Sequence, residues 1–333
     1  MKTVTSQEIR ELVYETATTA GFEHDVAEAL ADATTQAEIY GRSTVGLEHL
    51  FYYFRAAKNG LINVRPRISV QPMAGALLVV DADDGPMQYA YRQSETILID
   101  TARQQGIAAL LINNAFAGGE LGYFARRLAQ QGLVSLAFAN NPAVMSIGGS
   151  PDRLLGTNPI SYGIPLDDER AIVIDQATSS TARVNFQKYA QQQEPIPEGW
   201  ALDRYGQPTT SAATALDGVL LPFGGYKGGN IALLVEFLAM LGGANSSYTA
   251  APYYAGQRKQ GIGATILAVD AQKLPGYSQR IDELVHQFRQ DHGSLIRITQ
   301  LQGSHRNIEV SKSLWSQLQR YARHGTDTVD DTP

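Results

Sequence analysis

The stretch LLPFGGYKGGN, residues 220–230, decides more about the fold than any other part of the chain, and it opens directly onto the apolar residues 231–241. Glycines let the backbone adopt positive φ and bring its N–H groups close to a ligand. A helix over the apolar run would point its positive end at the same place. The stretch therefore predicts an anion site suited to a phosphate, to which Lys227 could add a charge.

The lysine does not turn this stretch into the phosphate loop of an NTPase. That loop needs the pattern G-x-x-x-x-G-K-[ST], whereas Gly228 follows Lys227 here and Tyr226 precedes it. An NTPase is therefore not predicted. The alternative interpretation is a glycine-rich turn that caps a buried helix and binds nothing.

Three further segments precede this stretch in a fixed order. They read GTNPI at residues 156–160, IDQATS at residues 174–179 and IPEGWALD at residues 196–203. Together, the four segments make the chain resemble the malate/L-lactate dehydrogenase family of non-Rossmann type. That family includes ureidoglycolate dehydrogenase, 2,3-diketogulonate reductase, sulfolactate dehydrogenase and reductases of cyclic imino acids such as piperideine and pyrroline carboxylates. The resemblance covers nearly the whole chain and is more specific for fold and cofactor than for substrate.

Composition narrows the remaining possibilities. The 333 residues are 44% hydrophobic, which is enough for a full core, and the length suggests two domains. The absence of cysteine rules out disulfides and thiolate sites and suits a reducing compartment. The net charge of −6 gives no attraction to nucleic acid or anionic lipid, and the longest apolar run is too short to span a bilayer. We expect a cytoplasmic protein without nucleic-acid or membrane partners.

Apolar periodicity outlines the secondary structure. Thr5 and Glu8 form a capping box before the first helix. The predicted helices end at Gly21 and Gly41 or cover residues 46–58, 93–105, 123–131, 278–290 and 312–323. The predicted strands cover residues 68–70, 76–80, 107–112 and 133–139. This alternation reads as a β-α-β unit, but the glycines do not form G-x-G-x-x-G, so a Rossmann domain is not predicted.

The resemblance implies a two-domain α/β fold. Residues 1–70 and 275–333 would form a helical terminal domain, and residues 71–274 a central domain with a mainly β cofactor-binding sheet. NAD or NADP would lie between the domains, and two subunits would complete the cleft as a homodimer that acts on a small carboxylate. Residues 325–333 read as a disordered acidic tail.

Cofactor contacts follow from the resemblance where residues match. It places Asp175, Ala177, Thr178 and Ser179 at the adenosine, Tyr226 and Lys227 at the pyrophosphate, and Asn158 near the nicotinamide. A weaker match puts Gly303, Ser304 and His305 beside the cofactor. The alternative is structural: a capped strand end for Asp175 and a plain turn at Thr178 and Ser179.

The substrate side departs from the family pattern. Relatives carry Ser-His-Gly, in which the His is the general acid or base, with an Arg four residues after it to hold the carboxylate. This chain has Thr44-Val45-Gly46, with His49 at the Arg position. A second family stretch, Asn-Ser-x-His-x-Gly, becomes residues 114–119, with Ala117 at the His position. Oxidation of a 2-hydroxy acid is therefore in question, because it needs a positioned base near neutral pH.

His49 is the leading replacement, since on a continuous helix it would lie one turn from Val45 on the same face. Tyr53 could orient the substrate or donate a proton. Their alternatives are an interfacial histidine and an aromatic packing residue. The remaining candidate substrate contacts are Arg42, Thr44, Asn114 and Lys188, of which Arg42 and Lys188 could equally be solvated surface charges. No histidine spacing matches a metal site, so no metal is predicted.

Three functions remain open. The first is nicotinamide-dependent hydride transfer at the carbon next to a carboxylate, with a 2-oxo acid or 2-hydroxy acid as default substrate. The second is reduction of a cyclic imino acid, whose protonated imine brings its own proton and so suits Val45. The third is a dinucleotide-binding relative that has lost catalysis.

Overall fold

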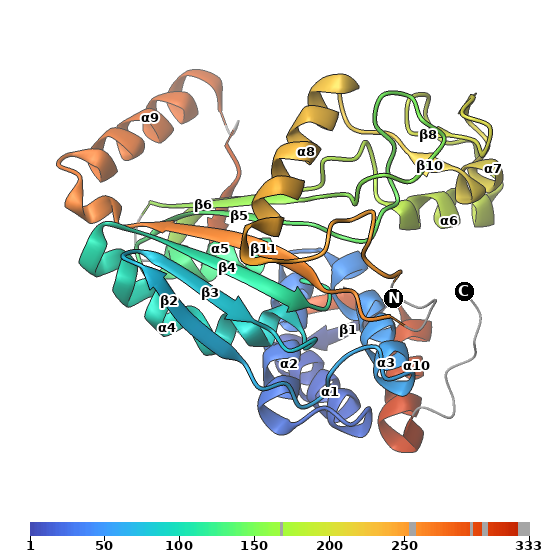
Figure 1. Ribbon diagram of the computed structural model, residues 1–333, viewed down its shortest axis with the longest axis horizontal. Helices are drawn as coiled ribbons and strands as arrows, with labels where there is room; N and C mark the ends of the chain where they lie inside the picture. The colour runs from blue at the N-terminus through green and yellow to red at the C-terminus, as the bar shows by residue number, and fades with distance from the viewer. Residues whose placement is uncertain (167–168, 253–257, 294–295, 302–305, 326–333) are drawn as a thin grey trace.

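A large mixed sheet organises the protein, whose computed structural model describes residues 1–166, 169–252, 258–293, 296–301 and 306–325 (Figure 1). Its strands are, in spatial order, β12 (Ile298–Gln300), β7 (Arg170–Gln176), β6 (Ile160–Pro165), β5 (Val134–Ala139), β11 (Ile262–Val269), β4 (Ile107–Ala115), β3 (Leu77–Asp81) and β2 (Ser69–Ala74). Among these described strands, β3 and β4 are the one parallel pair, and all other neighbours run antiparallel. A Rossmann half needs consecutive parallel strands, so the expected non-Rossmann α/β fold is confirmed.

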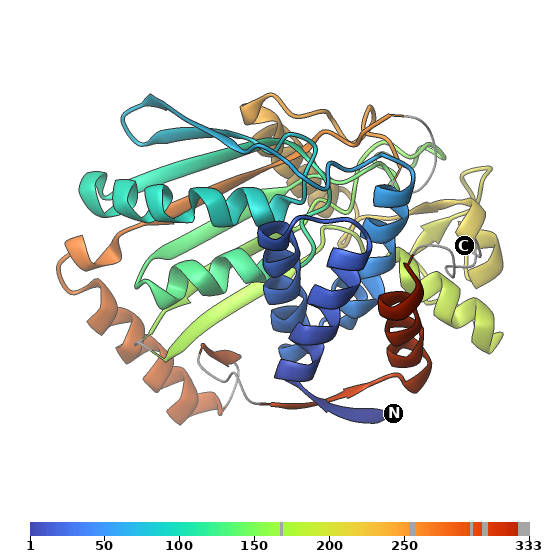
Figure 2. The ribbon, with the colours of Figure 1, turned by 90° about the horizontal axis from the view of Figure 1, so that it is seen from below.

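Helices cover both faces of this sheet. On one face lie α4 (Met87–Gln105) and α5 (Gly122–Gln130), which Figure 2 shows in front of the strands. On the other face α8 (Tyr226–Ala239) crosses β5 and β11 (Figure 1). The central strand β4 is accordingly apolar on both sides, with Leu110, Leu111 and Ile112 all buried. This explains why its sequence reads as an apolar run rather than as an alternation.

A separate helical unit contains both terminal regions. It comprises β1 (Lys2–Thr5), α1 (Ser6–Thr19), α2 (His24–Ile39), α3 (Leu50–Lys58), β13 (Asn307–Val310) and α10 (Lys312–His324). The predicted capping box of Thr5 and Glu8 is confirmed at the start of α1. β1 pairs antiparallel with β13, and Trp315 and Tyr321 of α10 enter the same core as Phe54 of α3. Figure 1 shows these elements below the sheet.

A small lobe lies beside the N-terminal end of α8 (Figure 1). It contains α6 (Arg183–Gln192), α7 (Ala212–Asp217) and a three-stranded sheet in the order β10 (Val219–Leu220), β8 (Ala201–Leu202), β9 (Pro208–Thr209). Its own apolar core includes Met145, Phe186 and Ala232. The lobe thus packs on α8 through Ala232 and leads, through β10, into the glycine-rich stretch.

The helix α9 (Tyr277–His292) lies along the edge of the large sheet, next to β7 and β12, and away from the helical unit (Figure 1). The short helices η3 (Met240–Gly242) and η4 (Ala271–Lys273) precede and follow β11. β12 pairs with β7 in the large sheet, whereas β13 pairs with β1 in the helical unit. The two-domain division itself stays a prediction.

Two boundaries differ from the sequence-based expectation. The helix expected over residues 93–105 begins at Met87, directly after Pro86, which is its N-cap in the extended conformation. The segment around residue 46 is not one helix, because Gly46 separates η1 (Ser43–Val45) from η2 (Leu47–His49). The expectation that Val45 and His49 share one continuous helix is therefore wrong. Of the tail at residues 325–333, all but Gly325 lies outside the described residues.

Candidate active site

A pocket of about 700 Å³ opens at the N-terminal end of α8. Its walls come from residues 146–149, from Ser180 and Gly199, and from the glycine-rich stretch that leads into the helix. On α8 itself the pocket is lined by Tyr226, Gly229, Asn230 and Leu233. The fold thus brings the glycine-rich stretch together with Gly199 of one other family segment and with Ser180, which directly follows another.

The glycine-rich stretch shapes this pocket through its backbone. Gly224 and Gly225 have φ values of 57° and 64°, which other residues rarely adopt. A Cβ on Gly228 would overlap the carbonyl oxygen of Phe223, so the first turn of α8 requires a glycine there. Because the N-cap is Gly225, it offers no side-chain oxygen to the first-turn N–H groups. Those groups and the positive helix end are left to an anion in the pocket.

Tyr226 and Lys227 occupy the first two positions of α8. Both side chains are exposed, and Tyr226, at 75% exposure, lines the pocket. Lys227 adds a positive charge beside the first-turn N–H groups. Their contact with a pyrophosphate stays a prediction, and their position is compatible with it.

The turn after β7 is bonded to the glycine-rich stretch. Ser180 N donates to Leu221 O at 2.8 Å, and Phe223 N donates to Thr178 O at 3.0 Å. The hydroxyls of Thr178 and Ser179 point into the protein, where they donate to Thr157 O at 2.8 Å and to Thr181 O at 2.7 Å. Ser180, rather than these two residues, lines the pocket. The turn therefore has a structural task, and direct cofactor contacts from Ala177, Thr178 and Ser179 stay predictions.

Asp175 lies on β7, away from the pocket lining. Its carboxylate accepts from Gly122 N at 2.9 Å, at the start of α5. Burial raises the pKa of Asp175 to about 6, and the nearby carboxylate of Glu120 adds to the shift, while Arg42 and Arg126 oppose it. Its predicted contact with the adenosine is untested, and its observed bond fixes the start of a helix.

Asn158 is fully buried and its side chain is enclosed by α8. Its Nδ2 donates to Ala232 O at 3.0 Å and to Glu236 Oε2 at 2.8 Å. A nicotinamide contact from this side chain would have to replace one of those bonds, so the predicted role stays untested. The predicted segment Gly303-Ser304-His305 lies outside the described residues.

The segments that contain Val45 and Ala117, the two positions where the resemblance leads us to expect histidine, approach each other. A Cβ on Gly119, two residues after Ala117, would stand 3.7 Å from Val45 O. Tyr53, which is 2% exposed, donates from its hydroxyl to Ala117 O at 2.8 Å and accepts from Gln88 Nε2 at 2.8 Å. Neither Val45 nor Ala117 can exchange a proton. Tyr53 already donates its own proton to a peptide oxygen, so here it positions the loop.

His49 stands at the start of α3, with its ring 5.0 Å from that of Tyr52 and 5.3 Å from that of Tyr53. Burial lowers the pKa of His49 to about 4. The imidazole is therefore neutral at neutral pH. The ring is half-buried among aromatic side chains, and this environment disfavours its charged form.

The remaining candidate substrate contacts do not gather at one point. Arg42 is exposed, precedes η1 and acts electrostatically on Asp175, and Thr44 is half-buried within η1. Asn114, at a φ of 49°, donates to Asp81 Oδ1 at 3.1 Å. Lys188 is exposed on α6 in the small lobe. Their role in substrate binding stays a prediction.

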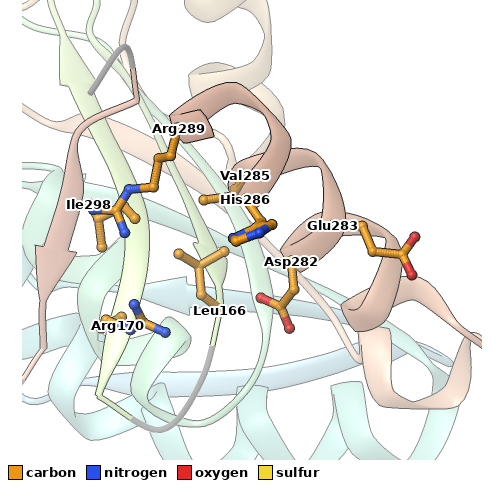
Figure 3. A pocket seen from close by; sticks show the side chains of 8 residues that line it. All are labelled: Leu166, Arg170, Asp282, Glu283, Val285, His286, Arg289 and Ile298. Atoms are coloured by element: carbon orange, nitrogen blue, oxygen red, sulfur yellow. The ribbon is translucent and has the colours of Figure 1, made fainter. Parts of the chain in front are cut away.

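A second cleft, of about 450 Å³, lies between α9 and the strands β7 and β12. Figure 3 shows Asp282, His286 and Arg289 of α9 on one side and Arg170 and Ile298 on the other. It contains no residue of the four family segments. In the described part of the chain, no three His, Cys, Asp or Glu side chains cluster to hold a metal, and no helix is long and apolar enough to cross a membrane.

Comparison with known sequences identifies relatives over almost the full length. Residues 4–319 match the family described as malate/L-lactate dehydrogenase. A Δ1-pyrroline-2-carboxylate/Δ1-piperideine-2-carboxylate reductase of Pseudomonas aeruginosa is 34% identical over 278 residues, 83% of each chain. An NADP⁺-dependent (2R)-3-sulfolactate dehydrogenase of Chromohalobacter salexigens is 33% identical over 303 residues, which cover 89% of this chain and 91% of the relative.

Solved structures give the same picture. The Δ1-piperideine-2-carboxylate reductase of Pseudomonas syringae superposes with a TM-score of 0.88 at 28% identity, covering 96% of this chain and 99% of the other. The sulfolactate dehydrogenase of Methanocaldococcus jannaschii superposes with a TM-score of 0.85 at 25% identity and covers 97% of each chain.

Proposed function

The chain belongs to the malate/L-lactate dehydrogenase family, and from this premise we propose which reaction its active site performs. Its relatives are dehydrogenases and reductases, and it is an NAD(P)-dependent oxidoreductase acting on small carboxylates. The proposed substrate is a cyclic imino acid with its carboxylate next to the C=N bond, such as a pyrroline or piperideine carboxylate. The main support for this proposal is that neither Val45 nor Ala117 can donate a proton to a reacting oxygen.

The pocket at α8 suits a dinucleotide by its shape and charge. Its volume is about 700 Å³, and six of its lining residues are glycines, which let the backbone approach a ligand. The positive helix end and Lys227 favour phosphate. Tyr226, Lys227, Ser180 and the first-turn N–H groups would hold the cofactor. When bound in reduced form, NAD(P)H supplies the hydride.

An imino acid makes few demands on proton chemistry. A protonated C=N bond already carries its proton on nitrogen, so two electrons arrive with the hydride at carbon, the N–H is kept, and the product is a cyclic amine. A 2-oxo acid would need a proton delivered to oxygen as the hydride adds. The neutral His49, whose pKa burial lowers to about 4, is a poor donor of that kind. The chain's own residues would therefore bind, orient and exclude water.

The second candidate is hydride exchange between a 2-oxo acid and a 2-hydroxy acid, the default expected from the sequence. It is supported by the similarity to sulfolactate dehydrogenases. It requires His49 or Tyr53 to handle the proton. Loss of catalysis with retained cofactor binding is the third candidate, and it is supported only by the missing histidines.

A spectrophotometric screen separates these candidates. NADH and NADPH oxidation would be followed with pyrroline and piperideine carboxylates, with pyruvate, and with other 2-oxo acids. Turnover of the cyclic imines at rates well above those of the oxo acids is expected. Faster turnover of oxo acids would favour the second candidate, and binding without turnover the third.

We also propose that the protein is a homodimer. Its support is a stripe of exposed apolar residues on α8 and η3, namely Leu234, Phe237 and Leu241, which are 52%, 64% and 60% exposed. Such a stripe beside a binding pocket is costly to leave in water. Light scattering at micromolar concentration should show no monomer.

A further inference from the structure

Glu236 is a buried carboxylate that the proposed reaction does not use. It lies in the middle of α8 and is 4% exposed. Its Oε1 accepts from Ser247 N at 2.5 Å, and its Oε2 accepts from Ser247 Oγ at 2.5 Å and from Asn158 Nδ2 at 2.8 Å. In the part of the chain that the structure describes, the ion pairs include none with Glu236.

Burying a carboxylate without a cationic partner destabilises the folded protein. Removing a charge from water without a cationic partner costs several kcal/mol in general, and hydrogen bonds recover part of that cost. An apolar side chain would fill this position of α8 at no such cost. Three donors bond the two carboxylate oxygens of Glu236, and they belong to Asn158 and Ser247. We therefore infer that the carboxylate serves to hold these two residues in place.

One of those donors belongs to the turn at residues 156–159. Asn158 has a φ of 33°, a left-handed conformation that asparagine tolerates better than most residues. Its side chain has a partner at each end: Nδ2 donates to α8, and Oδ1 lies 3.2 Å from Ser247 Oγ, whose single hydrogen it shares with Glu236 Oε2. Glu236 thus bonds Asn158 directly, and it also bonds Ser247, which contacts the amide oxygen of Asn158.

The same turn supports the pocket wall. Thr157 O accepts from both the N–H and the hydroxyl of Thr178 at 2.8 Å each, and Thr178 O accepts from Phe223 N at 3.0 Å. Phe223 leads directly into Gly224 of the pocket. Hydrogen bonds, together with the peptide bond between Thr157 and Asn158, therefore connect Glu236 to the glycine-rich stretch through Asn158, Thr157 and Thr178.

We propose that Glu236 is a positioning residue for the dinucleotide. Through Asn158 and Ser247 it fixes the turn at residues 156–159 against α8, and so holds the Thr178 turn and the glycine-rich stretch in their binding shape before the cofactor arrives. Such preorganisation raises affinity because ordering is not left to the moment of binding. The inference rests on the proposed binding of NADH or NADPH in this pocket.

The test is Glu236→Gln, which keeps the shape of the side chain. Either orientation of the new amide places its NH₂ group against a donor, Ser247 N or Asn158 Nδ2. Fluorescence titration with NADH and NADPH should show a Kd about tenfold higher than in the wild type. With cofactor saturating, the KM for the imino acid should stay within about twofold. In an Asn158→Ala background the same substitution should change the Kd by less than about twofold, because the connection is already cut.

Glu38→Gln is the matched control. Glu38 is also 4% exposed and also accepts from a backbone N–H and a serine hydroxyl, Leu47 N at 2.8 Å and Ser43 Oγ at 2.9 Å, but it lies in the helical unit. Its replacement should leave the Kd for NADH and NADPH within about twofold. An equal weakening in both variants would mean general loosening and would overturn the inference.

Other results distinguish failure of the positioning role of Glu236 from failure of the proposed NAD(P)H-dependent function. Folded Glu236→Gln with wild-type affinity would overturn the positioning role alone. If Glu236→Gln does not fold, Ser247→Ala, which removes one donor and keeps the backbone N–H, should raise the Kd about threefold, and an unchanged Kd would again overturn it. A wild-type protein that binds neither NADH nor NADPH would refute the proposed function as well.

Discussion

The pocket at α8 and the turn around Val45 are built in opposite ways. The pocket is made by backbone: glycines at positive φ, first-turn N–H groups and main-chain bonds between the 178–180 turn and the glycine-rich stretch. The chemistry of the turn around Val45 depends on which side chains it carries, and Val45 and Ala117 stand at the positions where the family resemblance implies histidine. A binding shape made by backbone persists while side chains change, whereas a proton donor is lost with one substitution. The difference agrees with the proposal that the protein shares its cofactor with the family and reduces a cyclic imino acid.

Val45→His should have the largest effect of the substitutions that test this contrast. If one side chain separates this site from ordinary dehydrogenases, the variant should raise kcat for 2-oxo acids by about 10²–10⁴-fold, the usual worth of a positioned general acid. Val45→Gln, similar in size but without an acid–base group, is the control. Steady-state kinetics with pyruvate and other 2-oxo acids measure the effect. No gain in Val45→His would mean that more than one residue distinguishes the two kinds of site.

Gly228→Ala should damage the pocket most. Its Cβ would overlap Phe223 O, and the resulting shift of backbone should cost about 3 kcal/mol, or roughly a hundredfold in Kd for NADH or NADPH. Gly229→Ala is the matched control, because a Cβ there would meet Ile147 at an ordinary 3.6 Å. Equal affinities in the two variants would contradict the view that backbone contact shapes this pocket.

Lys227→Ala tests the part of the pocket that does depend on a side chain. Loss of a charge-assisted contact to phosphate should cost about 1.5–3 kcal/mol and weaken binding roughly ten- to a hundredfold. The exposed Lys188, on α6, provides the control, since Lys188→Ala should leave the Kd unchanged. Titration at two salt concentrations would add a check, because screening should reduce the difference.

Asp175 and His49 should influence the free energy of unfolding in opposite directions between pH 4 and 6. The pKa of Asp175 is raised to about 6, so its stabilising contribution is present below the unfolded value near 4 and is lost as the pH rises through 6. The pKa of His49 is lowered to about 4, so its contribution is lost as the pH falls from 6.5 to 4. The wild-type stability should therefore be nearly flat in this range.

Asp175→Asn removes one of the two contributions. The variant should gain about 1–2 kcal/mol relative to the wild type between pH 4 and 7, and its stability should rise with pH. Denaturant unfolding at four pH values would measure this. A variant whose stability falls with pH would show that Asp175 is not the group responsible.

His49→Ala should give the smallest effect. Because the imidazole is neutral and sits among aromatic rings, kcat for cyclic imines should change by about threefold or less. A loss of 10²–10⁴-fold would instead restore His49 as the general acid. A raised KM with kcat kept would assign it to the carboxylate, in place of the family arginine.

Much of the fold could be predicted from the sequence because local patterns determine it. The Thr5–Glu8 capping box, the strand from Ile107 and the absence of G-x-G-x-x-G all gave correct expectations. Part of the pocket could also have been found, since the SIGGS run at residues 146–150 carries the same glycine signature as residues 224–229.

Side-chain direction could not be predicted, because it is set by distant contacts. Thr178 and Ser179 look like ligand contacts in sequence, yet their hydroxyls bond the protein interior. His49 looks like a catalytic histidine until Gly46 breaks the helix and aromatic rings surround it. The role of Glu236 could not be predicted, because a single acid in an apolar run is usually an exposed residue. In the fold it is enclosed by Asn158 and Ser247, which lie outside that run.

Because β1 pairs with β13, the helical unit can be completed only at the end of synthesis. Residues 2–5 emerge from the ribosome about 300 residues before their partners at 307–310. The core beneath α1 and α3 also waits for Trp315 and Tyr321. At roughly 5–20 residues per second, the first helices spend on the order of 15–60 seconds with an apolar face uncovered. Residues 1–60 are therefore the part of the nascent chain where association between unfinished chains should begin.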